Sequence, residues 1–349
     1  MQPIKIENKT IGEGQPVFII AEAGVNHNGS LKTALDMVNA AKESGADAIK
    51  FQTFKSESIV TVDTPSATYQ KKNTDSEETQ LEMLRRYELK EDDFKELKRY
   101  CMESGIIFLS TAHTDDIIDF LDNLVPAHKT GSGDLTNIPL LRKIAEKKKT
   151  MIVGTGMATM DEVRESLNAI HDEGNNDVVL LHCTTSYPCE PSDANLMAIK
   201  TMKDELGCLV GYSDHTTSTI TPSVAVALGA VVIEKHFTLD NNMPGPDHKA
   251  SLNPAKLKDM IQNVRLTETL LGKGLKKPCQ SELENISFIR KSLVAARDIK
   301  KGETIDTNNI TIKRPGTGMK PASLYEIDRK KKAKNDIKKD TLIKEEDIE

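Results

Sequence analysis

The chain has 349 residues, of which 38% are hydrophobic and 29% are charged. This composition is typical of a folded protein of about two domains and excludes a disordered chain. The net charge of −6 disfavours a protein that binds nucleic acid through its phosphates. The five cysteines form no CxxC pair, so they fit neither a zinc cage nor a disulfide framework. We find no apolar signal segment and no apolar run that could span a membrane, and we expect a cytoplasmic protein.

Short apolar runs alternate with longer amphipathic segments through the first 271 residues. The first run covers 17–22. It is followed at 30–42 by a segment in which Leu31, Leu35 and Val38 mark one apolar face of a helix, with Ser30 as its expected N-cap. The other runs lie at 46–52, 106–110, 127–130, 151–154, 178–182, 208–212 and 230–235.

Eight runs that are apolar on both faces, each followed by a helical pattern, predict a parallel sheet of α/β class. Closed into a ring, this sheet gives a (β/α)8 TIM barrel over residues 1–271. The alternative is an open, doubly wound sheet. No GxGxxG motif follows the first run, which disfavours the dinucleotide-binding form of that alternative.

The pattern changes at Ser292. Short alternating segments at 292–297 and 310–313 lie among turn residues, and 296–301 (ARDIKK) resembles 334–339 (KNDIKK). Two related β units in so short a stretch predict a small β-clip domain over 292–349. We expect residues 272–291 to form the linker between the two domains.

Every predicted strand ends in polar residues. Catalytic groups of a barrel gather at the C-terminal ends of its strands, so these residues predict an active site at that rim. Lys129 and the 131–133 turn, which contains Ser132, offer donors to a phosphate or carboxylate.

Two histidines, His215 and His236, follow strands that are neighbours in a closed barrel. We predict that their imidazoles converge on one divalent cation with open coordination positions, which suits Lewis-acid catalysis. The alternative is a pair of hydrogen-bonded loop histidines. Glu22 lies on the first strand, which closes against the last, and is a candidate general acid–base beside the same site.

The sequence also resembles the sialic acid synthases, the NeuB family. The matching segments cover nearly the whole chain in the family's order: 20–29 (IAEAGVNHNG), 50–54 (KFQTF), 69–73 (YQKKN), 80–83 (QLEM), 131–133 (GSG), 211–215 (GYSDH), 234–238 (EKHFT), 245–248 (GPDH) and 313–316 (KRPG). The resemblance implies a (β/α)8 barrel joined to a C-terminal SAF (antifreeze-like) domain. It also implies a transferase that condenses phosphoenolpyruvate with an N-acetylated hexose, giving a nine-carbon 2-keto acid and phosphate.

The resemblance further implies a role for each matching position. Glu22, His215 and His236 are then catalytic, and the two histidines bind Mn²⁺ or Mg²⁺. The residues implied to contact phosphoenolpyruvate are Lys50, Thr111, Lys129, Ser132 and Ser213. Those implied to line the sugar pocket are Gln52, Asn73, Tyr187, Glu234, Asp247 and, from the partner subunit of a domain-swapped homodimer, Arg314.

Several positions depart from the family pattern, among them Gly154, which stands where serine is common, and Asp134, which stands where glutamate is common. The sequence leaves the acceptor sugar open among N-acetylmannosamine, its 6-phosphate and 2,4-diacetamido-2,4,6-trideoxymannose. Two other functions are alternatives. One is a Schiff-base aldolase that uses Lys50, Lys129 or Lys235, and the other is a non-catalytic sugar-binding protein.

Overall fold

The computed structural model describes residues 1–65 and 78–349. Asn73 and the 69–73 segment therefore lie outside the described residues. The chain divides into two compact units, Met1–Gly272 and Lys273–Glu349, and each is described by itself. No described helix is both long and apolar enough to cross a membrane.

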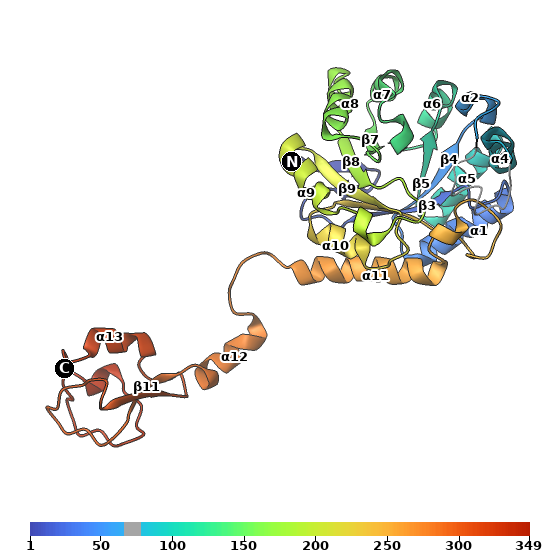
Figure 1. Cartoon of the computed structure of the whole chain (residues 1–349). Coiled ribbons are helices and arrows are strands. Elements are labelled where there is room, and N and C mark those ends of the chain that lie inside the picture. Colours follow the sequence, from blue (N-terminus) through green and yellow to red (C-terminus); the bar gives the residue numbers. More distant parts are fainter. Residues whose placement is uncertain (66–77) are drawn as a thin grey trace. The chain divides into compact units, whose positions relative to one another are not determined.

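The first unit is a closed barrel of eight parallel strands, ringed by helices (Figure 1). The strands are β3 (Phe18–Gly24), β4 (Ala48–Thr53), β5 (Ile107–Ala112), β6 (Ala127–Thr130), β7 (Thr150–Gly154), β8 (Val178–Cys183), β9 (Leu209–Asp214) and β10 (Val232–His236). They neighbour one another in chain order, and β10 closes the ring against β3. The predicted (β/α)8 barrel is confirmed, and the open sheet is wrong.

The surrounding helices follow the predicted alternation. They are α1 (Leu31–Ser44), α2 (Ser56–Ile59), α4 (Gln80–Tyr87), α5 (Glu91–Ser104), α6 (Asp115–Asp122), α7 (Ile138–Ala145), α8 (Met160–Asp172), α9 (Met197–Leu206), α10 (Thr221–Ala227) and α11 (Pro254–Leu271). Three short 3-10 helices, η1 (Ser132–Asp134), η2 (Pro191–Asp193) and η3 (His248–Ala250), lie in the loops. Ser30 caps α1 as predicted, since its side chain accepts a hydrogen bond of 3.2 Å from Thr33 N.

Several strands extend beyond the apolar runs that predicted them. β3 reaches Gly24, β9 reaches Asp214 and β10 reaches His236, so polar residues expected after the strands lie within them. The ladder continues through these residues because backbone pairing does not depend on the side chain. Alternate side chains at the strand ends therefore point into the barrel from fixed positions.

A hairpin that the sequence analysis did not predict precedes the barrel. Its strands, β1 (Ile4–Ile6) and β2 (Lys9–Ile11), are antiparallel. Ile4, Ile6 and Ile11 are buried in one cluster with residues that begin the barrel strands, among them Phe18 and Val232. The hairpin therefore closes the N-terminal end of the barrel.

The second unit contains α12 (Gln280–Ile289), the antiparallel strands β11 (Ser292–Ala295) and β12 (Ile310–Lys313), α13 (Leu324–Ile327), and the 3-10 helices η4 (Pro321–Ser323) and η5 (Glu345–Asp347). Helix α12 lies within residues 272–291, the segment expected to be a linker. The fold of the second unit places the two predicted repeats side by side.

The two repeats contact each other through equivalent residues. Ile299 and Ile337 exchange two backbone hydrogen bonds of 2.8 Å each. The Lys300 ammonium lies 2.9 Å from Asp336, and the Lys338 ammonium lies 2.9 Å from Asp298. The sequence repeat therefore corresponds to a local two-fold arrangement of the backbone and the charges.

We expect Ile6→Ala to lower the free energy of unfolding of the protein by about 2–5 kcal/mol, because it leaves a cavity in the cluster that closes the barrel. Lys5→Ala is the matched control, since Lys5 lies on the same strand and is exposed. Chemical denaturation followed by circular dichroism measures both variants. Equal stabilities of the two variants would show that the hairpin does not close the barrel core.

Candidate active site

A cavity of about 180 Å³ lies among the C-terminal ends of the barrel strands. It brings together most of the residues singled out in the sequence: Glu22, Lys50, Gln52, Thr111, Lys129, Ser132, Tyr187, Ser213, His215, Glu234 and His236. Asp247 lies beside it, with Oδ2 4.0 Å from His236 Nδ1. Arg314 follows β12 in the second unit and is exposed there.

A cluster of buried charges forms the floor of this cavity. Lys50 Nζ lies 2.8 Å from Glu22 Oε2 and 3.7 Å from Glu234 Oε2. Lys129 Nζ lies 3.5 Å from Glu234 Oε1. The strand register produces this contact, because Lys50 is the direct neighbour of Glu22 on β3. Cations and carboxylates therefore alternate across the floor, and their charges compensate one another.

Burial and neighbouring charges shift the pKa values in this cluster. Burial raises the pKa of Glu22 although the Lys50 ammonium opposes the shift. For Glu234 burial also acts upward, but the two lysines outweigh it and lower the pKa to about 2. Glu234 is therefore the permanent anion, whereas Glu22 is the carboxyl whose proton affinity is increased.

The pKa values of the two lysines shift in opposite directions. Burial lowers the pKa of Lys129, and Glu234 compensates only in part. Burial acts downward on Lys50 as well, but the carboxylates of Glu22 and Glu234 outweigh it, so its pKa is raised. Lys50 also donates a hydrogen bond of 3.1 Å to Thr111 Oγ1. Lys50 therefore stays protonated, which disfavours it as a Schiff-base nucleophile.

Three aromatic rings, those of Tyr187, His215 and His236, cluster in the same cavity. The ring centroids of His215 and His236 are 5.4 Å apart. The Tyr187 ring lies 4.2 Å from that of His215 and 5.5 Å from that of His236. The two imidazoles thus meet at one rim of the closed barrel, as their places after neighbouring strands predicted.

The hydrogen bonds of the two imidazoles leave nitrogen lone pairs available. His215 Nδ1 lies 2.7 Å from Thr184 O and donates to it, which leaves Nε2 unprotonated. His236 Nδ1 is buried and has no hydrogen-bond partner among the described residues. Burial lowers the pKa of both histidines, so both rings are neutral at neutral pH. Neutral imidazoles are the form that binds metal ions.

These two side chains fit a divalent cation whose other positions are open. Within residues 1–65 and 78–349, no group of three or more His, Cys, Asp and Glu side chains is arranged to hold a metal ion. Two features are nevertheless typical of histidines that bind metal ions. His236 Nδ1 has no hydrogen-bond partner among the described residues, and His215 Nδ1 donates to a backbone carbonyl. Asp247, beside His236, has a pKa raised to about 7 by burial and by Glu22.

Two glycines shape the other end of the cavity around Ser132. The Ser132 hydroxyl accepts a hydrogen bond of 3.0 Å from Gly156 N and lies 3.0 Å from Cys183 Sγ. A Cβ atom at Gly154 would lie 3.0 Å from this hydroxyl, and one at Gly156 would lie 2.9 Å from it. A serine at position 154 would therefore crowd the Ser132 hydroxyl. The glycine found at this position, where the family commonly has serine, leaves room for that hydroxyl.

Three further cavity residues were not assigned a site role from the sequence. His113, Cys183 and Thr185 all line the cavity. His113 was predictable, because it lies two residues after Thr111 and period-two alternation points both toward the barrel axis. Burial raises the pKa of the Cys183 thiol, so this cavity residue is not an activated nucleophile.

Lys235, one of the three lysines considered for an aldolase, does not line the cavity. Its side chain has no exposed surface, and its ammonium lies 2.6 Å from Asp214 Oδ2. A lysine enclosed in this way cannot reach a substrate carbonyl. Of the three candidates, this leaves Lys129 as the lysine that lines the cavity with a lowered pKa.

A barrel with this rim and a C-terminal β-clip defines the class of the protein. Residues 37–276 match the NeuB family, and residues 290–349 match the SAF domain. The chain therefore belongs to the NeuB family, as the sequence motifs predicted.

Proteins whose sequence similarity extends over nearly the whole of this chain support this assignment. The chain is 46% identical over 331 residues to the N,N'-diacetyllegionaminic acid synthase of Campylobacter jejuni, covering 94% of this chain and 99% of the relative. It is 45% identical over 324 residues to the protein of the same name from Legionella pneumophila, covering 91% of each. Among solved structures, the N-acetylneuraminic acid (sialic acid) synthetase of Leptospira borgpetersenii is similar, with 33% identity and a TM-score of 0.73. This match covers 82% of this chain and 95% of that one.

We expect the protein to bind Mn²⁺ in the absence of substrate, measured by isothermal titration calorimetry. His215→Ala and His236→Ala should each weaken binding by at least roughly tenfold, equivalent to about 1.4 kcal/mol. His171→Ala, at the last turn of α8, is the control and should bind as the unmodified chain does. Unchanged Mn²⁺ affinity in both site variants would rule out the metal assignment.

Proposed function

We propose that the protein is a nonulosonate synthase that condenses phosphoenolpyruvate with an N-acetylated amino sugar. The products are a nine-carbon 2-keto acid and phosphate. One observation carries the proposal: a single cavity combines buried ammonium and hydroxyl groups suited to a small phosphorylated acid with a pair of neutral imidazoles. The names of the two relatives from Campylobacter and Legionella, both synthases of a nine-carbon sugar acid, support the same reaction class.

Phosphoenolpyruvate would bind to the side of the cavity that carries the lysines. Lys50, Lys129 and the hydroxyls of Thr111, Ser132 and Ser213 are the proposed contacts. Glu234 holds both ammonium groups in place, and its second role is to accept a hydrogen bond of 3.0 Å from the Ser213 hydroxyl. These groups are already ordered, so they position the ligand and compensate its charge without rearrangement.

The acceptor sugar would bind between the imidazoles and the first strand, contacting Gln52, Tyr187, Glu234 and Asp247. Mn²⁺ or Mg²⁺ on His215 and His236, when bound, would polarise the sugar aldehyde. The imidazoles hold their neutral form because they are buried. Tyr187, which packs against both rings, limits the directions in which they can turn.

Glu22 is the proposed general acid–base. Its Oε1 accepts a hydrogen bond of 3.0 Å from Gln52 Nε2, and its Oε2 lies at the Lys50 ammonium. These contacts fix the carboxyl, while burial raises its pKa toward the range in which proton transfer is efficient. The net reaction joins C3 of phosphoenolpyruvate to the aldehyde carbon, adds one water and breaks the C–O bond to phosphate. Glu22 would move the protons that this exchange requires.

Among the three sugars, we propose 2,4-diacetamido-2,4,6-trideoxymannose as the acceptor. The names of the two relatives with 45% and 46% identity support this choice, because their product is a diacetylated legionaminic acid. N-acetylmannosamine and its 6-phosphate are the alternatives. No basic side chain has been assigned to the second phosphate that the 6-phosphate would carry.

Phosphate release from phosphoenolpyruvate tests the proposal with each of the three sugars, with and without a chelator. We expect release with one sugar that is lost on chelation and restored by Mn²⁺. Borohydride trapping distinguishes the aldolase, because a Schiff base on Lys129 would be reduced to a stable adduct. Borohydride trapping would replace the synthase with the aldolase, and no phosphate release with any of the three sugars would contradict the synthase.

Glu22→Gln should lower kcat by about 10²–10⁴-fold, because the amide cannot exchange the proton. The substitution preserves the shape of the side chain, so thermal melting should show a folded protein. Glu268→Gln is the control, since Glu268 is at the other end of the barrel, where it accepts a hydrogen bond from Val17 N. Near-normal turnover in E22Q would remove Glu22 from the mechanism.

We also propose a domain-swapped homodimer in which Arg314 of one chain binds the N-acetyl group of a sugar in the partner's barrel. Arg314→Ala should then raise KM for the sugar by roughly tenfold through loss of a charged hydrogen bond, and leave KM for phosphoenolpyruvate unchanged. Lys313→Ala, at the neighbouring exposed position, is the control.

Mixed dimers test the exchange of domains directly. If E22Q and R314A chains are unfolded, mixed and refolded, a swapped dimer places an intact Glu22 and an intact Arg314 in one barrel. Activity at low sugar concentration should then exceed that of either variant alone. No recovery in the mixture would show that each chain supplies its own Arg314, or that Arg314 does not reach a sugar.

A further inference from the structure

Strand β9, which His215 follows, and strand β10, which His236 ends, carry an ion pair on their outer face. Ser213 and His215 line the cavity and Asp214, between them, does not; Glu234 and His236 line it and Lys235, between them, does not. Asp214 and Lys235 are direct neighbours in the parallel register of β9 and β10. Both side chains have no exposed surface, so the pair is enclosed between the barrel and the elements outside it.

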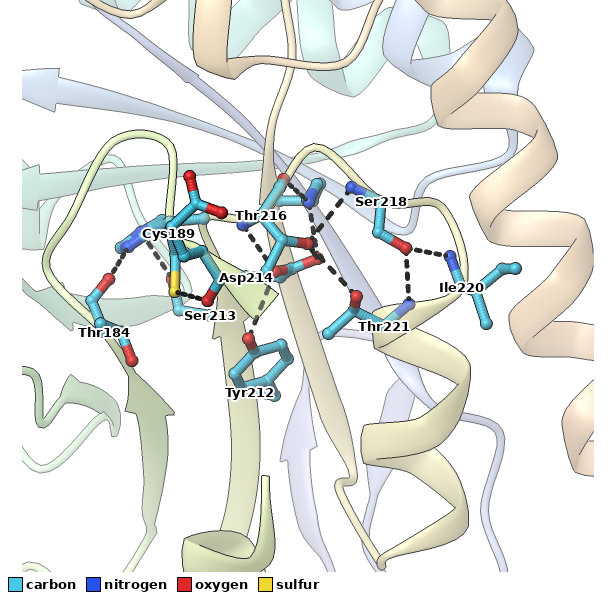
Figure 2. Close-up of polar contacts among 12 residues, drawn as sticks. Thr184, Cys189, Tyr212, Ser213, Asp214, Thr216, Ser218, Ile220 and Thr221 are labelled. Atoms are coloured by element: carbon cyan, nitrogen blue, oxygen red, sulfur yellow. Dashed lines mark hydrogen bonds and ion pairs between the residues drawn. The ribbon is translucent and has the colours of Figure 1, made fainter. Parts of the chain in front are cut away.

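Both members of this pair bind the backbone of Thr216, the residue that follows His215. Figure 2 shows Asp214 beside Thr216 and Tyr212. Lys235 Nζ lies 2.6 Å from Asp214 Oδ2 and donates a second hydrogen bond to Thr216 O. Asp214 Oδ1 accepts from Thr216 N at 2.9 Å and from the Tyr212 hydroxyl at 3.3 Å. Lys235, which precedes His236, therefore binds both neighbours of His215 in the chain, Asp214 and Thr216.

The network continues into the loop that leads to α10. The Thr216 hydroxyl bonds to Asp214 at 3.2 Å and to the Thr221 hydroxyl at 3.3 Å. Ser218 Oγ accepts from Ile220 N at 3.0 Å and from Thr221 N at 3.3 Å (Figure 2). The loop after His215 is thus joined to the same ion pair through Thr216 and is hydrogen-bonded within itself.

His215 is held independently from the opposite side. Its carbonyl oxygen accepts a hydrogen bond of 2.8 Å from Cys189 N, and its imidazole donates to Thr184 O. Both partners belong to the chain that follows β8. A shift of β9 against β10 would move His215 relative to His236, and the Asp214–Lys235 pair joins these two strands directly.

We propose that Asp214 and Lys235 are positioning residues that fix the separation of the His215 and His236 imidazoles, so that both can bind one divalent cation. A buried ion pair is costly to desolvate, and an apolar pair of similar volume is often as stable. General stability therefore does not explain these residues, whereas control of strand register beside both histidines does. The inference rests on the proposed function, in which the two histidines are the metal ligands.

The double variant Asp214→Asn with Lys235→Met tests this role. It removes both charges together, because either single variant would leave an unpaired buried charge and an unstable protein. Calorimetry should show Mn²⁺ affinity weakened on the order of tenfold, the lower end of the effect of removing groups that orient metal ligands. Turnover should show a lower kcat with an unchanged KM for phosphoenolpyruvate.

A second variant keeps the test decisive if the double variant does not fold. Thr216→Val keeps the ion pair and the β-branched shape and removes only the hydroxyl that joins Asp214 to Thr221. We expect a smaller loss of Mn²⁺ affinity than in the double variant. Hydrogen exchange of the 213–221 segment should increase in both variants if the network holds this loop.

The control is Asp47→Asn with Arg265→Met, which removes another ion pair of the same barrel. Arg265, on α11, lies 3.0 Å from Asp47, which precedes β4. We expect this variant to lose stability but to keep its Mn²⁺ affinity, and thermal melting of every variant separates the two effects.

The outcomes distinguish this inference from the proposed function. Mn²⁺ affinity equal to that of the unmodified chain in both the D214N/K235M and the T216V variants would overturn the positioning role and leave the synthase intact. An unmodified chain that binds no Mn²⁺ would overturn it as well. Failure to release phosphate with every sugar would instead contradict the synthase, while the comparison of Mn²⁺ affinities would still decide the positioning role.

Discussion

The closure of β10 against β3 is the contact on which the site depends. In this register Glu22 is the direct neighbour of His236, and on the other side of β3 it neighbours Lys50. The carboxyl and one imidazole are thus brought together by the first and last strands of the barrel, and the second strand adds the ammonium. An open sheet with the same strands would leave Glu22 at one edge and His236 at the other. The ring of backbone hydrogen bonds therefore brings these groups to one place on the rim.

The charges on the cavity floor are balanced before any ligand binds. Two lysines and two glutamates lie within 3.7 Å of one another in successive pairs. Such a cluster avoids unpaired buried charge in the free protein, which would otherwise be strongly destabilising. A phosphorylated acid that enters adds its negative charge to ammonium groups whose positions are already set. The lowered pKa of Glu234 and the raised pKa of Glu22 distinguish a carboxyl that stays ionised from one whose proton affinity is increased.

Much of this organisation was predictable from the sequence. The doubly buried runs marked all eight strands, and the order of the strands placed His215 beside His236. The hairpin was not predictable in the same way, because each of its strands has only three residues and shows no full period. Lys235 was considered as a nucleophile because it is a lysine at a strand end. Because side chains alternate along a strand, Lys235 points away from the cavity that His236 lines. Only the structure shows that the Lys235 side chain is fully buried and paired with Asp214. The sugar contacts of Asn73 and Arg314 stay predictions.

The hairpin also determines which end of the barrel is accessible for attachment. Ile4 packs at the end of the barrel that lies away from the cavity, and Met1 is exposed. A tag or surface tether fused ahead of Met1 therefore emerges on the side opposite the rim. Protein immobilised in this way would present the mouth of its barrel to the solution, which makes the amino terminus the suitable point of attachment for sensor-based measurements of ligand binding.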